Sequence, residues 1–473
     1  MTAHSAHNSV RDGSCADDRH AAALWERLSA AAPLRAAEPG DEVGGVAPAW
    51  VARPTSTQQV ADLLAAAHAT HAVSDGHPGA AAEPRSEAAA LTVVARGIGA
   101  HQSFGNPPRR LDLVIETGGL DEIIEYAPHD LVLRVGAGVR LNALAGLLAE
   151  QGQRLAVDPP RRGTVAGTLA VGTAGPLRLS HGSPRDLVIG MTFVRADGVV
   201  AHSGGKVVKN VAGYDLAKLF AGSYGTLGVI TELTFRLHPL PEASAWVGGL
   251  VDPAGVGPVI SALTHSQSVP AAVEYDVPAD GRASLWVQYE GTPVDLEART
   301  AQALAILATD SLATDSLATD SGAQAQVADE APFWWGDEPP GAALLKVTHV
   351  LGRGATLAAG LQIGAQEAGV QAAYRGSPLV GTGLVGVSDV GDGDDVGDSD
   401  DGGAAARFAA FVQGARARTA AAGGTLTVLS APPAWRAAVD VWGPVPGLEL
   451  MRALKDQFDP RGALAPGRFV GGI

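Results

Sequence analysis

The first half of the chain alternates short apolar runs with polar turns, a pattern typical of mixed α/β structure. Ser56 and Thr57 precede apolar residues that recur three and four positions apart between Val60 and Ala67. This spacing predicts a helix that begins at the Ser-Thr pair. A second helix is expected at 141–151, and the folded part should begin near Pro48. Buried strands are expected at 91–95, 111–116, 131–135, 188–195, 199–202 and 229–237.

Beyond Pro239 and Pro241 the pattern changes, because strand-like and helix-like stretches are then separated by long low-complexity loops. The loop at 308–321 repeats the pentad ATDSL. The loop at 389–403 is rich in aspartate but lacks the glutamate that closes a calcium-binding loop. We interpret both segments as loops, and residues 74–90 as a linker-like insertion.

These shifts divide the chain into four expected parts. Residues 1–46 would form a flexible N-terminal extension with one short helix near 21–32. Residues 47–240 would form a front domain, and residues 241–431 a middle domain. The C-terminal segment, 432–473, is too short to fold alone, so we expect it to pack back on one of these domains.

Composition and charge narrow the possible functions. The 473 residues are 46% hydrophobic and 18% charged, as expected for a globular protein. A net charge of −16 argues against nucleic-acid binding, which needs a basic surface. Cys15 is the one cysteine, which excludes an internal disulfide, a four-cysteine zinc site and a cysteine-ligated iron–sulfur cluster. Since we find neither a long apolar run nor a signal-peptide pattern, we expect a cytoplasmic enzyme or enzyme subunit.

Three glycine-rich segments carry the candidate chemistry. The first, 95–101, directly follows an expected strand, so its backbone N–H groups could approach phosphate oxygens. Its spacing departs from G-x-G-x-x-G because Gln102 stands at the sixth position, which argues against a Rossmann dinucleotide fold. A P-loop motif is absent from the sequence. From the residues alone, a structural turn and a phosphate loop are both open.

The second segment, 158–175, alternates glycine with threonine and should not form an ordinary amphipathic helix. Its small residues would admit either a flat ligand or a tight backbone crossing. The third, 204–230, contains three of the five lysines of the chain. Whether its polar residues are functional or a chance cluster stays open: Lys206, Lys209, Asn210, Tyr214, Asp215 and Lys218.

Several sequence blocks are specific when taken together. They are DPP at 158–160, HGSPRDLVIG at 181–190, GGKVVKNVAGYDLAKLFAGSYGTLGVITEL at 204–233 and FDPRGALAPGR at 458–468. In order and spacing they resemble the FAD-binding domain of the vanillyl-alcohol-oxidase superfamily, of the p-cresol-methylhydroxylase type. The chain is most similar to the FAD-binding E subunits of bacterial glycolate oxidase. The resemblance covers the front domain and the C-terminal end, and it is loose in the middle.

The resemblance implies an α+β fold, with two α/β subdomains around FAD, an α+β cap over 241–431 and a tail that returns to the FAD domain. Residues 97–101 would form the pyrophosphate loop, Gly228 and Ile230 would contact the adenine end, and Arg468 would close the site. The full set of implied FAD-binding residues is Arg96, Gly97, Ile98, Gly99, Ala100, His101, Pro159, Thr164, Val165, Gly167, Thr168, Gly175, Gly182, Asp186, Gly228, Ile230 and Arg468.

His101 needs separate consideration, because some relatives attach the flavin covalently through a histidine in this loop. Covalent attachment, a phosphate contact and a solvent-facing side chain are the three alternatives. His181 is expected to be structural or adjacent to the flavin. The E-H-G motif of the catalytic D-type subunits is absent, and His265 and His349 stand alone, so we name no catalytic residue and no metal ligand.

The function implied by the resemblance is that of an FAD-binding subunit in a complex that oxidises glycolate, a 2-hydroxy acid, to glyoxylate. Its partners would be a catalytic D-type flavoprotein and an iron–sulfur F-type subunit, through which the chain would meet the membrane only indirectly. One alternative is a stand-alone FAD-dependent oxidase of a sugar alcohol, lactone or other alcohol. Another is a scaffold that keeps the fold without catalysis.

Overall fold

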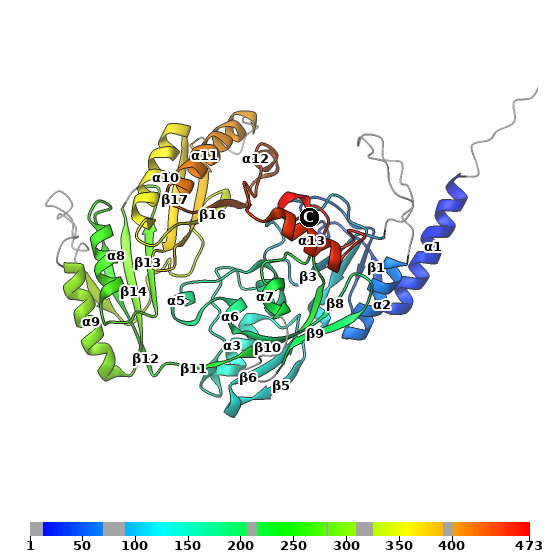
Figure 1. Cartoon of the computed structure of the whole chain (residues 1–473), viewed down its shortest axis with the longest axis horizontal. Helices are drawn as coiled ribbons and strands as arrows, with labels where there is room; N and C mark the ends of the chain where they lie inside the picture. Colours follow the sequence, from blue (N-terminus) through cyan, green and yellow to red (C-terminus); the bar gives the residue numbers. More distant parts are fainter. Residues whose placement is uncertain (1–12, 70–89, 206–214, 281, 309–324, 391–400) are drawn as a thin grey trace, which may run out of the picture.

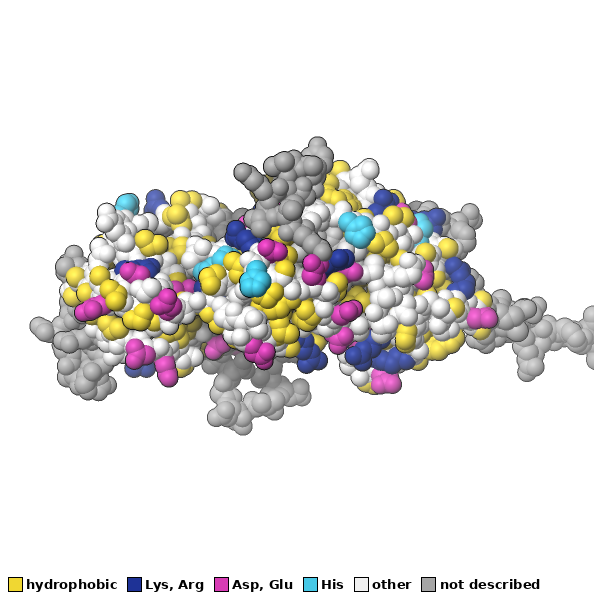
Figure 2. Space-filling model, turned by 90° about the horizontal axis from the view of Figure 1, so that it is seen from below, with side chains coloured by type: hydrophobic (Ala, Val, Ile, Leu, Met, Phe, Trp, Pro, Cys, Tyr) yellow, Lys and Arg dark blue, Asp and Glu magenta, His cyan; other side chains and the backbone are white. Residues whose placement is uncertain are grey.

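The computed structural model describes residues 13–69, 90–205, 215–280, 282–308, 325–390 and 401–473. Within these ranges the chain forms a front domain and a cap domain (Figure 1). The C-terminal helix, drawn in red, lies on the front domain beside the junction with the cap. None of the helices in this part of the chain is long and apolar enough to cross a membrane. On the face seen in Figure 2, acidic and basic side chains are interspersed.

The front domain begins with a four-stranded sheet in the order β1-β2-β4-β3. Its strands are β1 (Leu34–Ala36), β2 (Trp50–Ala52), β3 (Val93–Arg96) and β4 (Leu113–Glu116). β2, β4 and β3 run parallel, and helix α2 (Thr57–His68) covers the sheet's apolar side. The Ser56 hydroxyl accepts a hydrogen bond from the Gln59 backbone N–H at 3.2 Å, which confirms the predicted start of α2.

The described part of the N-terminal region contains the helix expected near 21–32, but it is not a loose extension. Helix α1 (Gly13–Ala31) packs against α2, and β1 pairs antiparallel with β2. Leu24 and Leu28 are buried in the core of the front domain. The packing of α1 could not be predicted from the sequence, because two leucines four residues apart in an alanine-rich helix give only a weak apolar stripe.

A five-stranded antiparallel sheet completes the front domain, in the order β5-β6-β10-β8-β9. Its strands are β5 (Ile123–Ala127), β6 (Val132–Gly136), β8 (Val188–Val194), β9 (Val200–Gly204) and β10 (Val229–Arg236). Both sheets share one apolar core, which includes Leu63, Phe193 and Leu233. The predicted strands at 131–135, 188–195, 199–202 and 229–237 are therefore confirmed within one or two residues.

Short elements connect these strands. They are η1 (Thr117–Gly119), η2 (Pro128–Asp130), α3 (Leu141–Ala149), β7 (Gln153–Arg154), α4 (Val165–Val171), α5 (Arg178–His181), α6 (Pro184–Leu187), α7 (Leu216–Phe220) and β11 (His238–Pro239). Part of the second glycine-rich segment is thus helical, although we expected no ordinary helix there. Thr164 caps α4 by accepting from the Gly167 N–H at 3.2 Å, and Gly172 ends it with a φ of 73°.

The cap domain is built on an eight-stranded antiparallel sheet in the order β15-β12-β14-β13-β17-β18-β16-β19. The strands are β12 (Ala243–Leu250), β13 (Ala272–Val277), β14 (Ser284–Gly291), β15 (Gln326–Ala328), β16 (Ala343–Thr348), β17 (Val370–Ser377), β18 (Thr382–Asp389) and β19 (Leu426–Ser430). Helices α8 (Val256–His265), α9 (Pro293–Ala308), α10 (Gly354–Ala368) and α11 (Asp401–Ala421) cover one face (Figure 1).

The central strands β13 and β14 of the cap sheet are buried on both faces over most of their length, but the chemistry of the two faces differs. On β13, Val273, Tyr275 and Val277 join the apolar core under the helices. The alternate residue Glu274 is also buried, on the side toward the front domain, and accepts a hydrogen bond from the Ser377 hydroxyl. Burial raises the pKa of Glu274 to about 8, so this carboxyl is mostly protonated at neutral pH.

Among the described residues, two ion pairs join the cap to the front domain. The Arg154 guanidinium donates to Glu290, with 2.7 Å between Nη1 and Oε1. Arg161 donates to both carboxylate oxygens of Glu338, at 2.8 and 2.9 Å. Bidentate arginine–carboxylate pairs restrict orientation as well as distance, so they fix the angle between the domains.

The C-terminal segment divides between the two domains. Helix α12 (Pro433–Ala437) stays with the cap, where Trp435 stacks on Phe408 with ring centres 4.9 Å apart. Helix α13 (Leu448–Phe458) and the residues after it, including η3 (Val470–Gly472), return to the front domain. There the backbone of Val93 exchanges hydrogen bonds of 2.8 Å with Ala463 and Ala465, so the returning chain extends the sheet beyond β3.

A buried ion pair holds this return in place. The Lys455 ammonium donates to the Asp459 carboxylate at 2.6 Å and to the carbonyls of Thr226 and Leu464 at 2.9 and 2.8 Å. Asp459 also accepts backbone N–H bonds from Ala463 and Leu464. Its side chain is fully buried, so every polar atom of the pair depends on these partners.

We predict that Asp459→Asn lowers the free energy of unfolding by about 3 kcal/mol, because it leaves the Lys455 ammonium buried without its counter-charge. Urea unfolding followed by tryptophan fluorescence measures this loss. The exposed Asp456→Asn on the same helix is the control and should cost little. Equal stability of the two variants would contradict the assignment.

A second prediction concerns pH. Between about 4.5, the usual pKa of a glutamate, and about 8, folded Glu274 holds a proton that the unfolded chain releases. The free energy of unfolding should therefore fall as the pH rises through this window. Glu274→Gln, which cannot ionise, should lose less stability than the wild type between pH 5 and pH 8.5, measured by urea unfolding at each pH. The exposed Glu330→Gln serves as control, and identical slopes for all three proteins would refute the prediction.

Candidate functional site

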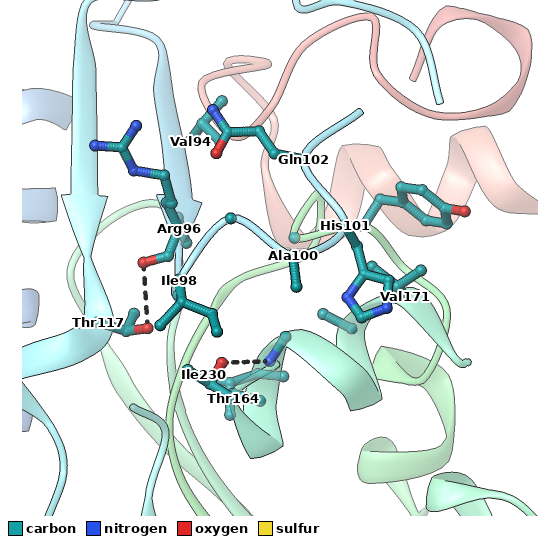
Figure 3. A pocket seen from close by; sticks show the side chains of 18 of the residues that line it. Val94, Arg96, Ile98, Ala100, His101, Gln102, Thr117, Thr164, Val171 and Ile230 are labelled. Atoms are coloured by element: carbon teal, nitrogen blue, oxygen red, sulfur yellow. Dashed lines mark hydrogen bonds between the residues drawn. The ribbon is translucent and has the colours of Figure 1, made fainter. Parts of the chain in front are cut away.

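A first cavity of about 110 Å³ lies within the front domain (Figure 3). The loop after β3 forms one wall, and α4, η1, residues 224–230 and Arg468 form the others. Eleven of the residues proposed from the sequence line it: Arg96, Gly97, Ile98, Gly99, Ala100, His101, Thr164, Gly167, Gly228, Ile230 and Arg468. Segments far apart in the sequence therefore meet in one concave site.

The glycines of the loop are needed because the backbone passes close to its neighbours. A Cβ atom at Gly97 would lie 2.4 Å from the Thr164 hydroxyl oxygen, so a larger residue there would displace the start of α4. Gly99 has a φ of 77°, which side chains other than glycine rarely adopt. The loop then turns back, and the Gln102 N–H donates to the Gly99 carbonyl at 3.0 Å. The result is a loop that presents backbone rather than side chains.

Arg96 contributes to the site through its backbone only. Figure 3 shows its guanidinium pointing away from the cavity. The guanidinium pairs with Asp41 at 2.8 Å and with Glu116 at 2.7 Å, while its carbonyl accepts from the Thr117 hydroxyl at 3.3 Å. Hydrogen bonds from Arg35 and Arg96 hold the pKa of Asp41 well below its usual range. The side chain therefore anchors the base of the loop.

Arg468 is the charged group of the first cavity. It is 5% exposed and donates to the carbonyls of Gln102 and Phe104 at 3.0 and 2.9 Å. Its Nη1 atom has no hydrogen-bond partner, and within the described residues it forms no ion pair. Burial lowers its pKa to about 10. A buried cation without a counter-charge is costly, so the site favours an anionic ligand.

His101 lies where the first cavity meets a second one, and it lines both. It is buried, which excludes the solvent-facing alternative. Its Nε2 atom is 3.4 Å from the Thr173 hydroxyl, and its ring lies edge-on to Phe104. Burial and the nearby Arg161 lower its pKa to about 4, so it is neutral at physiological pH. Covalent attachment and a phosphate contact both stay predictions.

The remaining residues proposed from the sequence lie outside the first cavity. Gly175 lines the second cavity. Pro159, Val165 and Thr168 are buried but line neither cavity. Gly182 ends α5, and Asp186 lies in the first turn of α6, where its carboxylate accepts from the Ser183 N–H at 2.8 Å. Their roles in cofactor binding stay predictions.

Of the polar residues in the third glycine-rich segment, Lys206, Lys209, Asn210 and Tyr214 lie outside the described residues. Asp215 and Lys218 are half exposed and 3.3 Å apart.

Nine residues of the first cavity were missed by the sequence analysis: Val94, Ala95, Gln102, Thr117, Ala166, Ala170, Val171, Tyr224 and Gly225. Most are small or apolar and carry no chemical signature. Tyr224 could have been noticed because it stands between glycines. Its φ of 56° is unusual for a tyrosine, and its ring packs against Trp442 and Phe469. This aromatic cluster closes the side of the site next to the cap.

The second cavity, of about 450 Å³, lies between the two domains. The buried face of the cap sheet supplies Glu274, Lys346, Arg375 and Ser377 to its walls, and the front domain supplies Arg161 and Arg178 among others. Five basic and three acidic side chains line it, although the whole chain is strongly acidic. His101, Val171 and Tyr224 line both cavities, so the two adjoin.

Comparison with known proteins shows an FAD-binding domain in the front half of the chain. A family profile described as "FAD binding domain" matches residues 85–204. The glycolate oxidase subunit GlcE of Escherichia coli (strain K12) is 43% identical over 125 residues, which is 26% of this chain and 36% of that protein. The glycolate oxidase subunit GlcD of Bacillus subtilis (strain 168) is 31% identical over 188 residues, 39% of this chain and 40% of that protein. The matched segment spans less than half of each of these relatives.

Solved structures show the same architecture. p-Cresol methylhydroxylase with substrate bound superposes with a TM-score of 0.69 at 15% identity, covering 95% of this chain and 96% of that one. An alkyldihydroxyacetonephosphate synthase superposes with a TM-score of 0.58 at 15% identity, covering 89% and 76%. The expected α+β fold is thereby confirmed. The backbone loop at Gly97–Gly99 and the unpaired Arg468 suit a pyrophosphate. The chain therefore contains an FAD-binding domain within the p-cresol methylhydroxylase-type fold, and FAD is its cofactor.

Proposed function

We propose that the protein is the FAD-binding subunit of a glycolate oxidase-type complex, an FAD-dependent oxidoreductase that oxidises the CH–OH group of 2-hydroxy acids. The observation that carries the proposal is the junction of the two cavities. One is lined by residues suited to a dinucleotide, and the other is a polar cavity that adjoins it through His101 and Tyr224. The similarity to glycolate oxidase subunits supports glycolate as the substrate and glyoxylate as the product.

The chain's own residues perform binding and shielding in this account. Backbone N–H groups of the Gly97 loop and the Arg468 guanidinium hold the pyrophosphate, and the aromatic cluster of Tyr224, Trp442 and Phe469 excludes water. When bound, FAD supplies an acceptor for the two electrons that oxidation of the substrate releases. Glu274 holds a proton at neutral pH, so it serves as a hydrogen-bond donor. We assign no residue as the catalytic base.

Partner subunits follow from the need to pass the electrons on. One cysteine, Cys15, cannot ligate an iron–sulfur cluster, so electrons that leave the flavin require an external carrier. We propose an iron–sulfur subunit in this role, together with a D-type flavoprotein subunit that oxidises the substrate. Any link to the membrane would then run through these partners.

The proposal predicts the visible spectrum of the purified full chain under anaerobic glycolate. The flavin band should bleach when the partner subunits are present and should stay unchanged when the chain is alone. Bleaching by the chain alone, with recovery in air, would replace the proposal with the stand-alone oxidase. A band that no 2-hydroxy acid bleaches, even with partners, would contradict the proposed substrate class.

A second prediction tests the loop. Gly97→Ala places a methyl group against Thr164, which displaces the loop. We expect the free energy of FAD binding to become less favourable by about 1–3 kcal/mol, which weakens FAD binding by about 5- to 150-fold. Titration of the apoprotein with FAD, followed by flavin fluorescence, measures the change. Gly118→Ala is the matched control, because a Cβ atom there meets nothing within 4 Å. Equal FAD affinity of the two variants would remove the Gly97 loop from the FAD site.

A further inference from the structure

Two cations of the second cavity lack an ion-pair partner among the described residues. Arg178 begins α5 on the front domain, and Lys346 lies in β16 on the opposite wall, in the cap sheet. Neither side chain forms a hydrogen bond or an ion pair with any described residue. Both are partly buried, and burial lowers the pKa of each. The charge of Arg178 also lowers the pKa of Lys346, so the two cations repel each other across the cavity.

The other basic groups of the cavity are neutralised or exposed. Arg161 is paired with Glu338, as described above, and Arg375 donates to Asp276 at 2.8 Å and to the carbonyls of Asp337 and Glu338. Arg185 is exposed at the surface. The positive charge without a partner is therefore concentrated on Arg178 and Lys346.

The acidic side chains nearby do not pair with these two cations. Asp186 lies close enough for its charge to favour the charged form of Arg178, but it forms no ion pair with Arg178, and its carboxylate accepts from the Ser183 N–H and hydroxyl at 2.8 Å. Glu338 is engaged by Arg161, and the side chain of Asp337 is exposed. Glu274 interacts with Arg178, but it holds its proton at neutral pH and therefore carries little negative charge. Keeping two like charges partly buried and unpaired is unfavourable, and an anion between them would relieve the cost.

We propose that Arg178 and Lys346 bind the carboxylate of a small organic acid between the front and cap domains. A guanidinium on one wall and an ammonium on the other can each donate to one carboxylate. The protonated Glu274, which lines the same cavity, can donate to a further oxygen of the acid. The cavity of about 450 Å³ admits a small acid.

The proposed binding site is inferred from the positions of Arg178, Lys346 and Glu274 in the second cavity. The identity of the acid as a 2-hydroxy acid rests on the proposed function. A ligand held by Arg178 and Lys346 would bridge the two domains. It would also lie in the cavity that shares His101 and Tyr224 with the proposed FAD site. The pair would thus make this cavity bind acids in preference to neutral alcohols.

Isothermal titration calorimetry of the full chain with oxalate tests this proposal, because oxalate carries the carboxylate and has no C–H bond to oxidise. We expect saturable binding at one site, and no binding of ethylene glycol. Arg178→Met and Lys346→Met should each weaken oxalate binding at least tenfold, since each removes a charge-assisted hydrogen bond. Arg178→Lys and Lys346→Arg keep the charge and should retain more affinity than the methionine variants.

The exposed Arg353→Met in the cap lowers the net charge by the same amount and should bind oxalate like the wild type. Thermal unfolding of each variant identifies any that fails to fold. The proposal would be overturned if both methionine variants bound oxalate with wild-type affinity. It would also be overturned if sulfate and ethylene glycol bound as tightly as oxalate. The readout does not depend on the flavin. A chain that binds oxalate at this pair but no FAD would refute the proposed function alone, and a chain with FAD but no oxalate binding would refute this inference alone.

Discussion

The site depends on one buried ion pair far along the chain. Lys455 and Asp459 form an ion pair and hydrogen-bond to four backbone groups. These bonds fix the point where the C-terminal segment turns back onto β3. From that turn, residues 463–465 pair with Val93, and Arg468 reaches the loop that β3 leads into. The charge of the first cavity is therefore supplied from the end of the sequence, whereas its backbone loop comes from the first quarter. Folding must join the two before the first cavity is complete.

The cap sheet imposes the second constraint. Helices α8–α11 cover one face, so the opposite face must be buried against the front domain or exposed to water. Burial brings Glu274, Lys346 and Arg375 to the domain junction, where the ion pairs Arg154–Glu290 and Arg161–Glu338 fix the geometry. A polar cavity beside the glycine loop is the consequence. The architecture thus separates two tasks, with a backbone-lined site in one domain and a charged site between the domains.

Much of the front domain could be predicted from the sequence because its signals are local. Ser56 caps α2 as expected, and the strand after which the glycine loop begins is where the apolar run places it. The sequence did not show that the Arg96 side chain points away from the cavity, since that depends on Asp41 and Glu116 being nearby in space. Arg178 and Lys346 were missed for the same reason. Each looks ordinary in its own segment, and only the fold brings them to one cavity, where neither forms an ion pair with a described residue.

The central claim, that the first cavity holds FAD, is tested most directly by the ratio of FAD to polypeptide in the purified full chain, measured by absorbance after denaturation and completed by titration with added FAD. The account predicts saturation at one FAD per chain, with Arg468→Met losing most of the bound cofactor. A folded wild-type chain that takes up no FAD, or an Arg468→Met variant that retains a full complement, would contradict it.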